Sequence, residues 1–190
     1  MEHTALDYRG LNWVVDEEKN ESLASTGDRK NNYTNWLPSV LLKYDVNDDF
    51  KLRASFTETL SRPKYSALIP SVNYNRAESE ATIGNPDLKP TTSYNFDLSA
   101  EYYFKSVGLV SLGFFYKSIN DVIVDEVWQG MSPEIPISGD YEYEISKPIN
   151  AYDANLYGVE VAYQRDFSFI APALKCLGFY GNYTYTANKT

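Results

Sequence analysis

The 190-residue sequence contains one cysteine, Cys176, and one histidine, His3. A single cysteine excludes an internal disulfide framework. A single histidine beside the first residues argues against catalytic triads, zinc sites and histidine general bases. There is also no phosphate-binding Gly-Lys-Ser/Thr loop and no Gly-x-Ser-x-Gly nucleophile motif. We therefore expect no catalytic residue, no metal site, no cofactor and no enzyme activity.

Positive charge and long apolar runs are also scarce. The 17 lysines and arginines face 26 aspartates and glutamates, which gives a net charge of −9 and an isoelectric point of about 4.6. Such a balance argues against a nucleic-acid partner. No run of 18 consecutive apolar residues occurs, so we expect no transmembrane helix. The opening residues Met1–Thr4 lack the basic and apolar regions of a secretory signal.

Aromatic residues, in contrast, are abundant. They make up 15% of the chain, and 17 of them are tyrosines, while the mean hydropathy is only −0.43. A membrane-spanning β-strand needs only about 9–11 residues with an apolar side chain at every second position. A hydrophilic average is therefore compatible with a membrane protein built from strands, and the pattern along the chain has to decide.

Two segments alternate apolar and polar side chains with the period of a β-strand. In one of them, all six even positions from Tyr94 to Phe104 are apolar, which chance would produce in about 1 case in 150. The other, residues 50–60, breaks the alternation only at Glu58. Weaker repeats lie at residues 36–46, 110–117, 157–163 and 177–185, and a further strand is expected near residues 4–15. The pattern predicts an all-β fold of about seven strands.

The connections between these strands alternate between short and long. The short ones are expected at residues 46–49, 105–108 and about 166–173, and the long ones at about 16–32, 61–92 and 129–140. In an antiparallel up-and-down meander this alternation puts all short turns at one end, as in outer-membrane barrels. A soluble β-sandwich has no reason to segregate its loops by length, so we favour the barrel. The Asp45–Asp49 segment opens like a calcium loop but lacks its glycine and closing glutamate, and we interpret it as a turn.

The two faces of the predicted sheet differ in character. The apolar face, which we expect to contact lipid, includes Leu52, Phe56, Phe96, Leu98, Tyr102, Leu112, Phe114 and Val161. Its aromatic residues fall into two groups, one near the short turns (Tyr44, Phe50, Tyr102, Phe104, Tyr163) and one nearer the long loops (Trp36, Tyr94, Tyr183, Tyr185). Two such bands are typical of a lipid-facing wall. The charged residues of the opposite face, expected to line a lumen, are Lys51, Arg53, Asp97, Glu101, Lys117 and Glu160.

Five motifs follow in order from about Tyr33 to the end of the chain. They are Phe56-Thr-Glu-Thr-Leu-Ser-Arg-Pro63, Gly84-Asn-Pro-Asp-Leu-Lys-Pro90, the strand Tyr94–Phe104, Phe115-Tyr-Lys-Ser-Ile-Asn-Asp-Val-Ile123 and Leu156-Tyr-Gly-Val-Glu-Val161. Together they resemble the barrel of TonB-dependent outer-membrane receptors. The resemblance implies a 22-stranded transmembrane barrel of a Gram-negative outer membrane, plugged by an N-terminal domain, that imports scarce ligands with energy passed on by TonB.

The sequence departs from that family pattern in its extent. About seven strands cannot close a barrel of such width, and no plug and no final aromatic-ended strand are recognised. We therefore expect residues 1–190 to be part of the barrel domain, an incomplete segment from its C-terminal half. Its partners would be outer-membrane lipid, the remainder of the barrel and plug, and TonB through the missing N-terminal part.

The long loops offer the candidate ligand contacts, which are Tyr65, Tyr74, Arg76 and Trp128. Exposed aromatic and arginine side chains stack on sugars or hold iron chelates. The implied ligand is a small molecule or oligosaccharide, such as a siderophore, a vitamin or a glycan. Two alternatives stay open at this point: a passive porin-like outer-membrane channel, and a soluble β-rich binding module.

Overall fold

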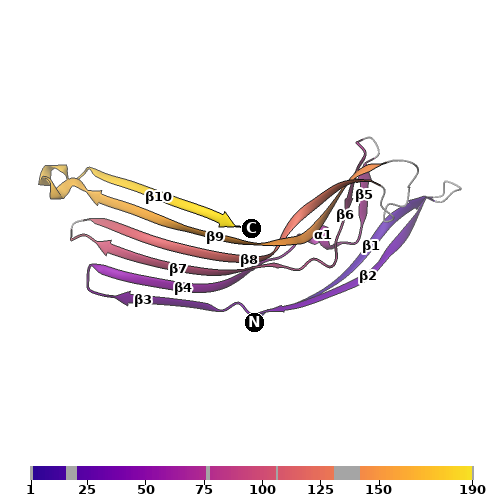
Figure 1. Ribbon diagram of the computed structural model, residues 1–190, viewed down its shortest axis with the longest axis horizontal. Helices are drawn as coiled ribbons and strands as arrows, with labels where there is room; N and C mark the ends of the chain where they lie inside the picture. The colour runs from indigo at the N-terminus through magenta and orange to yellow at the C-terminus, as the bar shows by residue number, and fades with distance from the viewer. Residues whose placement is uncertain (1, 16–20, 76–77, 106, 131–141, 190) are drawn as a thin grey trace. The chain divides into compact units, whose positions relative to one another are not determined.

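The protein, seen in a computed structural model, is built almost entirely from β-strands (Figure 1). The structure describes residues 2–15, 21–75, 78–105, 107–130 and 142–189. In chain order the elements are β1 (Glu2–Val15), β2 (Glu21–Asn35), β3 (Ser39–Asp45), β4 (Phe50–Ser61), α1 (Tyr65–Leu68), β5 (Val72–Asn75), β6 (Glu80–Ile83), β7 (Thr91–Tyr103), β8 (Gly108–Gly130), β9 (Tyr143–Asp166), the 3-10 turns η1 (Phe167–Phe169) and η2 (Pro172–Leu174), and β10 (Gly178–Lys189).

The chain divides into two compact units. The first unit comprises Met1–Trp36, Ser61–Thr91 and Asp121–Tyr152, and the second comprises Leu37–Leu60, Thr92–Asn120 and Asp153–Thr190. Strands β8 and β9 contribute to both units. All other strands of ten residues or more, apart from the β1–β2 pair, belong essentially to the second unit.

The second unit is one sheet in which neighbours in space follow the chain, in the order β3-β4-β7-β8-β9-β10. Strand β3 pairs with β4, β7 with β8 and β9 with β10, each in the antiparallel sense. Figure 1 shows the three short connections of this sheet together at one end, on the left of the view. The predicted all-β meander with its short turns at a common end is thereby confirmed.

The β3–β4 connection is a four-residue turn stabilised by one side chain. The Val46 N–H donates to the Phe50 carbonyl oxygen at 3.0 Å. The Asn47 side-chain oxygen accepts hydrogen bonds from the N–H groups of Asp49 (2.9 Å) and Phe50 (2.8 Å). Asparagine is favoured in turns because its side chain bonds the backbone just ahead of it. The segment interpreted above as a turn rather than a calcium loop is a turn.

The register of the strands brings side chains of one kind opposite one another. Across β3 and β4, Val40 lies opposite Phe56, and Lys43 lies opposite Arg53. Across β7 and β8, Leu98 lies opposite Phe114. Because successive residues of a strand point to opposite sides of the sheet, this register sorts apolar side chains to one face and polar ones to the other.

The first unit holds the buried core. A hairpin of β1 and β2 runs antiparallel from Glu2 opposite Asn35 to Val15 opposite Glu21. Short strand β6 pairs with β5 and, in the parallel sense, with β9. Two buried clusters fill this unit: Ala81, Ile83, Tyr143 and Ile145, with Val72 and Trp128 packed against them, and Leu68 with Leu88, against which Leu6, Ala67 and Ile123 pack.

Several predicted boundaries differ from the structure. The long connection expected at residues 16–32 contains strand β2 from Glu21 onward, and residues 16–20 lie outside the described part. Few apolar residues occur in β2, so it shows no alternation, and its place is given by backbone pairing with β1. The connection at 61–92 contains α1, β5 and β6, and Trp36 precedes β3 rather than belonging to it. The connection expected at 129–140 lies mostly outside the described residues.

The Gly84–Pro90 motif holds three distant segments together. The Gly84 N–H donates to the Ser71 carbonyl at 3.0 Å, and a Cβ on Gly84 would lie 1.9 Å from the Ile69 carbonyl oxygen. Asn85 donates from its side chain to the Pro148 carbonyl at 2.9 Å. Only glycine fits at such a close backbone approach.

The side chain of Asn150 completes this arrangement. Its oxygen accepts the Lys89 N–H at 2.9 Å, and its nitrogen donates to the carbonyls of Lys89 and Asp121, each at 3.0 Å. One amide thus satisfies three backbone groups from two other segments, which ties β9 to the turn before β7 and to β8.

Gly158 of β9 is required by packing rather than by backbone conformation. A Cβ there would lie 2.5 Å from Cζ of Phe115 and 2.2 Å from the Tyr185 carbonyl oxygen. Gly113 of β8 is the natural control, because its Cβ would meet nothing closer than the Glu160 Cβ at 3.8 Å.

We expect Gly158→Ala to lower the free energy of unfolding of the complete protein by about 1–3 kcal/mol, the usual cost of overpacking. Gly113→Ala should leave it within about 1 kcal/mol of the original value. Urea unfolding of the two variants, followed by tryptophan fluorescence, measures the difference. Equal losses in both would show that the Phe115 ring does not lie over Gly158.

Candidate functional site

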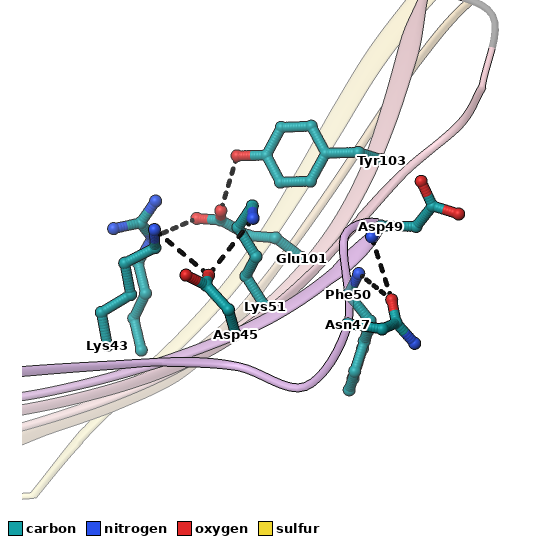
Figure 2. Close-up of polar contacts among 9 residues, drawn as sticks. Lys43, Asp45, Asn47, Asp49, Phe50, Lys51, Glu101 and Tyr103 are labelled. Carbon is teal, nitrogen blue, oxygen red and sulfur yellow. Dashed lines mark hydrogen bonds and ion pairs between the residues drawn. The ribbon is translucent and has the colours of Figure 1, made fainter.

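A cluster of charged side chains occupies the polar face of the second unit near the β3–β4 turn (Figure 2). Asp45, the last residue of β3, receives two ammonium groups on its Oδ1 atom. Lys43 Nζ lies 3.1 Å away and Lys51 Nζ lies 3.2 Å away. Lys43 and Asp45 are two positions apart on the same strand, and Lys51 lies opposite Asp45 on β4, so the strand register alone brings the three together.

Glu101 of β7 is the second acceptor of this cluster. Arg53 Nε of β4 donates to Glu101 Oε1 at 3.0 Å, and the Tyr103 hydroxyl donates to Glu101 Oε2 at 2.8 Å. The Glu101 side chain is only 17% exposed, against 46% for Arg53. Figure 2 shows the Tyr103 hydroxyl directed at the Glu101 carboxylate. Both carboxylate oxygens are therefore engaged, which is the condition for a half-buried charge to be tolerated.

The remaining predicted lumen residues lie farther along the same face. Asp97, Lys117 and Glu160 line one hollow together with Ser99. Asp97 Oδ2 also accepts a hydrogen bond from Ser55 Oγ at 2.9 Å. The six charged residues singled out from the sequence thus come from four adjacent strands and gather on one face. Three of them, Lys51, Arg53 and Glu101, form ion pairs within the cluster.

The opposite face is apolar and open. Six of the eight residues expected to contact lipid are exposed by 38–54%: Phe96, Leu98, Tyr102, Leu112, Phe114 and Val161. Leu52 and Phe56 are half-buried. A soluble monomer rarely exposes so many large apolar side chains on one contiguous surface, because each leaves its apolar area in water.

Two rows of aromatic rings cross this apolar face. The row near the short connections runs Tyr102, Phe104, Tyr163, Phe179, with centroid separations of 5.3, 6.2 and 6.1 Å. The second row runs Tyr94, Phe56, Phe96, Tyr116, with separations of 6.3, 4.8 and 6.3 Å. We call these the turn-side row and the loop-side row.

The spacing of the two rows is set by β7, which contributes to both. Tyr94 in the loop-side row and Tyr102 in the turn-side row lie on this strand, as do Leu98 and Ala100 between them. Phe104, which directly follows β7 and belongs to the turn-side row, lies ten residues after Tyr94. That separation corresponds to roughly 34 Å of extended chain. Tilted by about 45°, that length covers about 24 Å, close to the height of the apolar band of an outer-membrane barrel.

The candidate ligand contacts belong to the first unit and differ in their surroundings. Tyr65 begins α1 and is 71% exposed. Trp128 lies within β8 and packs partly buried against the cluster that contains Ile145. Tyr74 lies in β5, and Arg76 falls outside the described residues. Of the two whose side chains the structure describes, Tyr65 is exposed and Trp128 is partly buried.

Two residues with specific side-chain contacts were not singled out from the sequence. Asn95, 8% exposed, donates from its side chain to the carbonyl (3.2 Å) and hydroxyl (3.3 Å) oxygens of Thr57 and to the Thr59 hydroxyl (3.2 Å), which joins β7 to β4. Arg165 stands at an apolar-face position of β9, stacked between aromatic rings. The first looks like any other polar-face residue in the sequence, while the second was detectable as a charge interrupting the alternation after Tyr163.

The described ranges contain no group of three or more histidine, cysteine, aspartate or glutamate side chains placed to hold a metal ion. In the same part of the chain, no helix has the length and apolar character needed to cross a membrane.

Comparison with known proteins identifies a family for this sheet with one apolar and one charged face. The family described as TonB-dependent receptor-like, β-barrel, matches residues 9–190. No curated protein matches the sequence. Among solved structures, the siderophore receptor PirA from Pseudomonas aeruginosa is similar over 81% of this chain and 25% of its own, with 21% identity and a TM-score of 0.58.

Two further receptors share the fold. The ferric enterobactin receptor PfeA from Pseudomonas aeruginosa matches over 84% of this chain and 23% of its own, with 23% identity and a TM-score of 0.61. The hemophore receptor HasR of Serratia marcescens, solved with its hemophore HasA and heme, matches over 86% and 28% respectively, with 10% identity and a TM-score of 0.51. The chain spans about a quarter of the length of these relatives.

A double-mutant cycle tests the Arg53–Glu101 pair. We expect Arg53→Gln and Glu101→Gln to show a coupling free energy of up to about 1 kcal/mol in unfolding of the complete protein, the range of partly exposed ion pairs. The control cycle combines Arg53→Gln with Lys117→Gln, which should be additive within about 0.5 kcal/mol because the two residues share no partner. A coupling no larger than that of the control would contradict the pairing.

Proposed function

The chain belongs to the TonB-dependent receptor β-barrel family, and from this premise we propose that it forms part of the barrel wall of an outer-membrane receptor that imports a scarce extracellular ligand. The observation that carries the proposal is the pairing of an apolar face, crossed by two aromatic rows, with a charged face on the same strands. Lipid would contact the apolar face, and a water-filled or plugged interior would contact the charged face. The orientation follows the family geometry, with the short connections toward the periplasm.

In this proposal the segment supplies part of the barrel wall and the long loops attached to it. Residues 1–190 would be one part of a barrel domain of 22 strands, completed by further strands and filled by an N-terminal plug. Lys51, Arg53, Asp97, Glu101, Lys117 and Glu160 would then face the plug. The Lys51–Asp45 and Arg53–Glu101 pairs lower the cost of placing those charges inside the barrel. Energy transfer from TonB would act on the plug, outside this segment.

The ligand class is proposed from the receptors whose structures are similar to this chain. The similar structures include a siderophore receptor, a ferric enterobactin receptor and a hemophore receptor solved with its hemophore and heme. We infer an iron-bearing small molecule first, with vitamins and glycans as the other ligand classes. Tyr65 is the best placed contact, because an exposed aromatic ring offers a flat surface to a chelate or a sugar.

Two other functions make different demands on the same strands. A passive channel would share the wall but would have no plug, so a globular domain encoded upstream of the barrel separates the two. A soluble binding module would have to bury the apolar face against another part of the protein, and it would then remain monodisperse without detergent.

The lipid-facing assignment is tested by two neighbouring residues of β7. In the full-length receptor we expect Leu98→Arg to cost roughly 2–4 kcal/mol of stability in lipid, because it places a charge near the middle of the bilayer. Ser99→Arg, one residue on and directed to the charged face, should be much milder. Folding into lipid vesicles, followed by heat-modifiable gel mobility, measures both. Equal effects of the two changes would count against the assignment.

The ligand-binding role is tested by uptake in iron-limited cells. We expect deletion of the intact gene to reduce uptake of labelled ferric enterobactin or heme, and Tyr65→Ala to weaken binding of the transported probe about five- to tenfold without loss of stability. Trp128→Ala is the matched contrast, because its loss should chiefly lower stability by about 2–3 kcal/mol through the packing it removes. Unchanged binding with Tyr65→Ala would remove this residue from the site, and unchanged uptake of every probe after gene deletion would remove the iron ligand.

A further inference from the structure

Arg165 interrupts the apolar face of the second unit. It follows Val161 and Tyr163 at the same parity on β9, and across the strand pair it lies opposite Phe179. Its guanidinium carbon is 4.4 Å from the ring centre of Phe104 and 3.9 Å from that of Phe169. The cation therefore extends the turn-side row, held between two rings.

Within the part of the chain that the structure describes, the Arg165 guanidinium forms no salt bridge, and the neighbouring Asp166 carboxylate attracts it only at longer range. Its Nε atom is buried and makes no hydrogen bond to any described residue. The Oδ1 atom of Asp166 accepts hydrogen bonds from the backbone N–H of Ser168 at 2.9 Å and from the Ser168 hydroxyl rather than from Arg165. An unpaired guanidinium is costly in an apolar setting, and an anion that contacts the terminal amino groups of Arg165 would offset part of that cost.

The surroundings hold Arg165 in one place. A Cβ on Gly108 would lie 3.0 Å from Arg165 Cγ, so the arginine stem crosses the β7–β8 turn where only glycine leaves room. The Asp166 N–H donates to the Val107 carbonyl at 3.1 Å, which fastens the start of the β9–β10 connection to the same turn. Stacking on two rings fixes the plane of the guanidinium and leaves the edge formed by its terminal amino groups as the direction of contact.

The position of the group selects the kind of anion. A guanidinium edge binds two phosphate oxygens at once. Arg165 lies in the turn-side row, and aromatic rows of this kind sit at the level of lipid headgroups. Exposed Lys105 and Lys175, in the two connections that the Val107–Asp166 hydrogen bond joins, add positive charge at the same end of the sheet.

We propose that Arg165, stacked between Phe104 and Phe169, binds the phosphate of a glycerophospholipid headgroup in the periplasmic leaflet. The inference rests on the proposed function, since it requires the apolar face to stand in a membrane. It adds a defined lipid site on the outside of the wall, separate from any ligand taken up through the interior.

The test uses the full-length receptor, purified in detergent and titrated with phosphatidylglycerol under native mass spectrometry. We expect one lipid to bind more tightly than the rest, and Arg165→Gln to weaken that binding about tenfold, the loss of a charge-assisted hydrogen bond. Arg165→Lys keeps the charge but loses the planar guanidinium that can bind two phosphate oxygens at once, so binding should be intermediate. Lys175→Gln is the control for general surface charge and should change binding by less than about twofold.

Three outcomes would overturn the lipid site. Binding by Arg165→Gln that equals the original would remove the arginine from the site. Losses of equal size in Lys175→Gln would reduce it to diffuse attraction. Displacement of the lipid by inorganic phosphate would assign the site to a soluble anion. If Arg165→Gln fails to fold, Arg165→Lys and Phe169→Ala carry the test, because binding as tight as the original in both would equally exclude it.

Membrane fractionation distinguishes this failure from failure of the proposed function. A receptor that fractionates with the outer membrane and shows heat-modifiable mobility, yet binds lipid without regard to Arg165, loses only the headgroup site. A protein recovered in soluble form would contradict the outer-membrane wall itself, and the lipid site with it.

Discussion

The structure depends on one geometric constraint, which is that successive side chains of a strand leave the sheet on opposite sides. Once backbone hydrogen bonds pair β7 with β8 in the observed register, Leu98 and Phe114 must share a face, and Ser99 must share the other. A shift of one residue would exchange the two faces completely. The apolar surface, the charged cluster and the two aromatic rows are therefore consequences of a single register rather than three separate features.

This constraint explains how much of the fold could be predicted from the residues. The alternation of Tyr94–Phe104 predicts a strand with one apolar and one polar face, and the structure confirms it as β7, Thr91–Tyr103. Strand β2 shows no such alternation, because few of its side chains are apolar. Its position is determined by backbone pairing with β1. Strands β5 and β6 are too short to show a period at all, and they form where buried Ala81 and Ile83 meet Tyr143 and Ile145.

The candidate site follows the same division. The charged residues were found because they occupy the polar parity of recognisable strands, and their pairing across Lys51 and Asp45 or Arg53 and Glu101 follows from the register. The structural roles of Asn95 and Trp128 were not found, because nothing in the sequence distinguishes them from ordinary strand and loop residues. The Asn95 side chain is explained only when Thr57 and Thr59 are seen beside it, and Trp128 was taken for a loop residue because the continuation of β8 to Gly130 leaves no periodic signal.

The amide of Asn150 has a consequence for the order in which the chain assembles. It bonds the backbone of Lys89, 61 positions earlier, while Asn85 bonds Pro148, 63 positions later. Contacts of such long sequence separation are formed late, because the intervening chain must first be confined. The Gly84–Pro90 motif can therefore pair early with the neighbouring Ala67–Ser71 segment, whereas its contacts with β9 form only once that strand is in place.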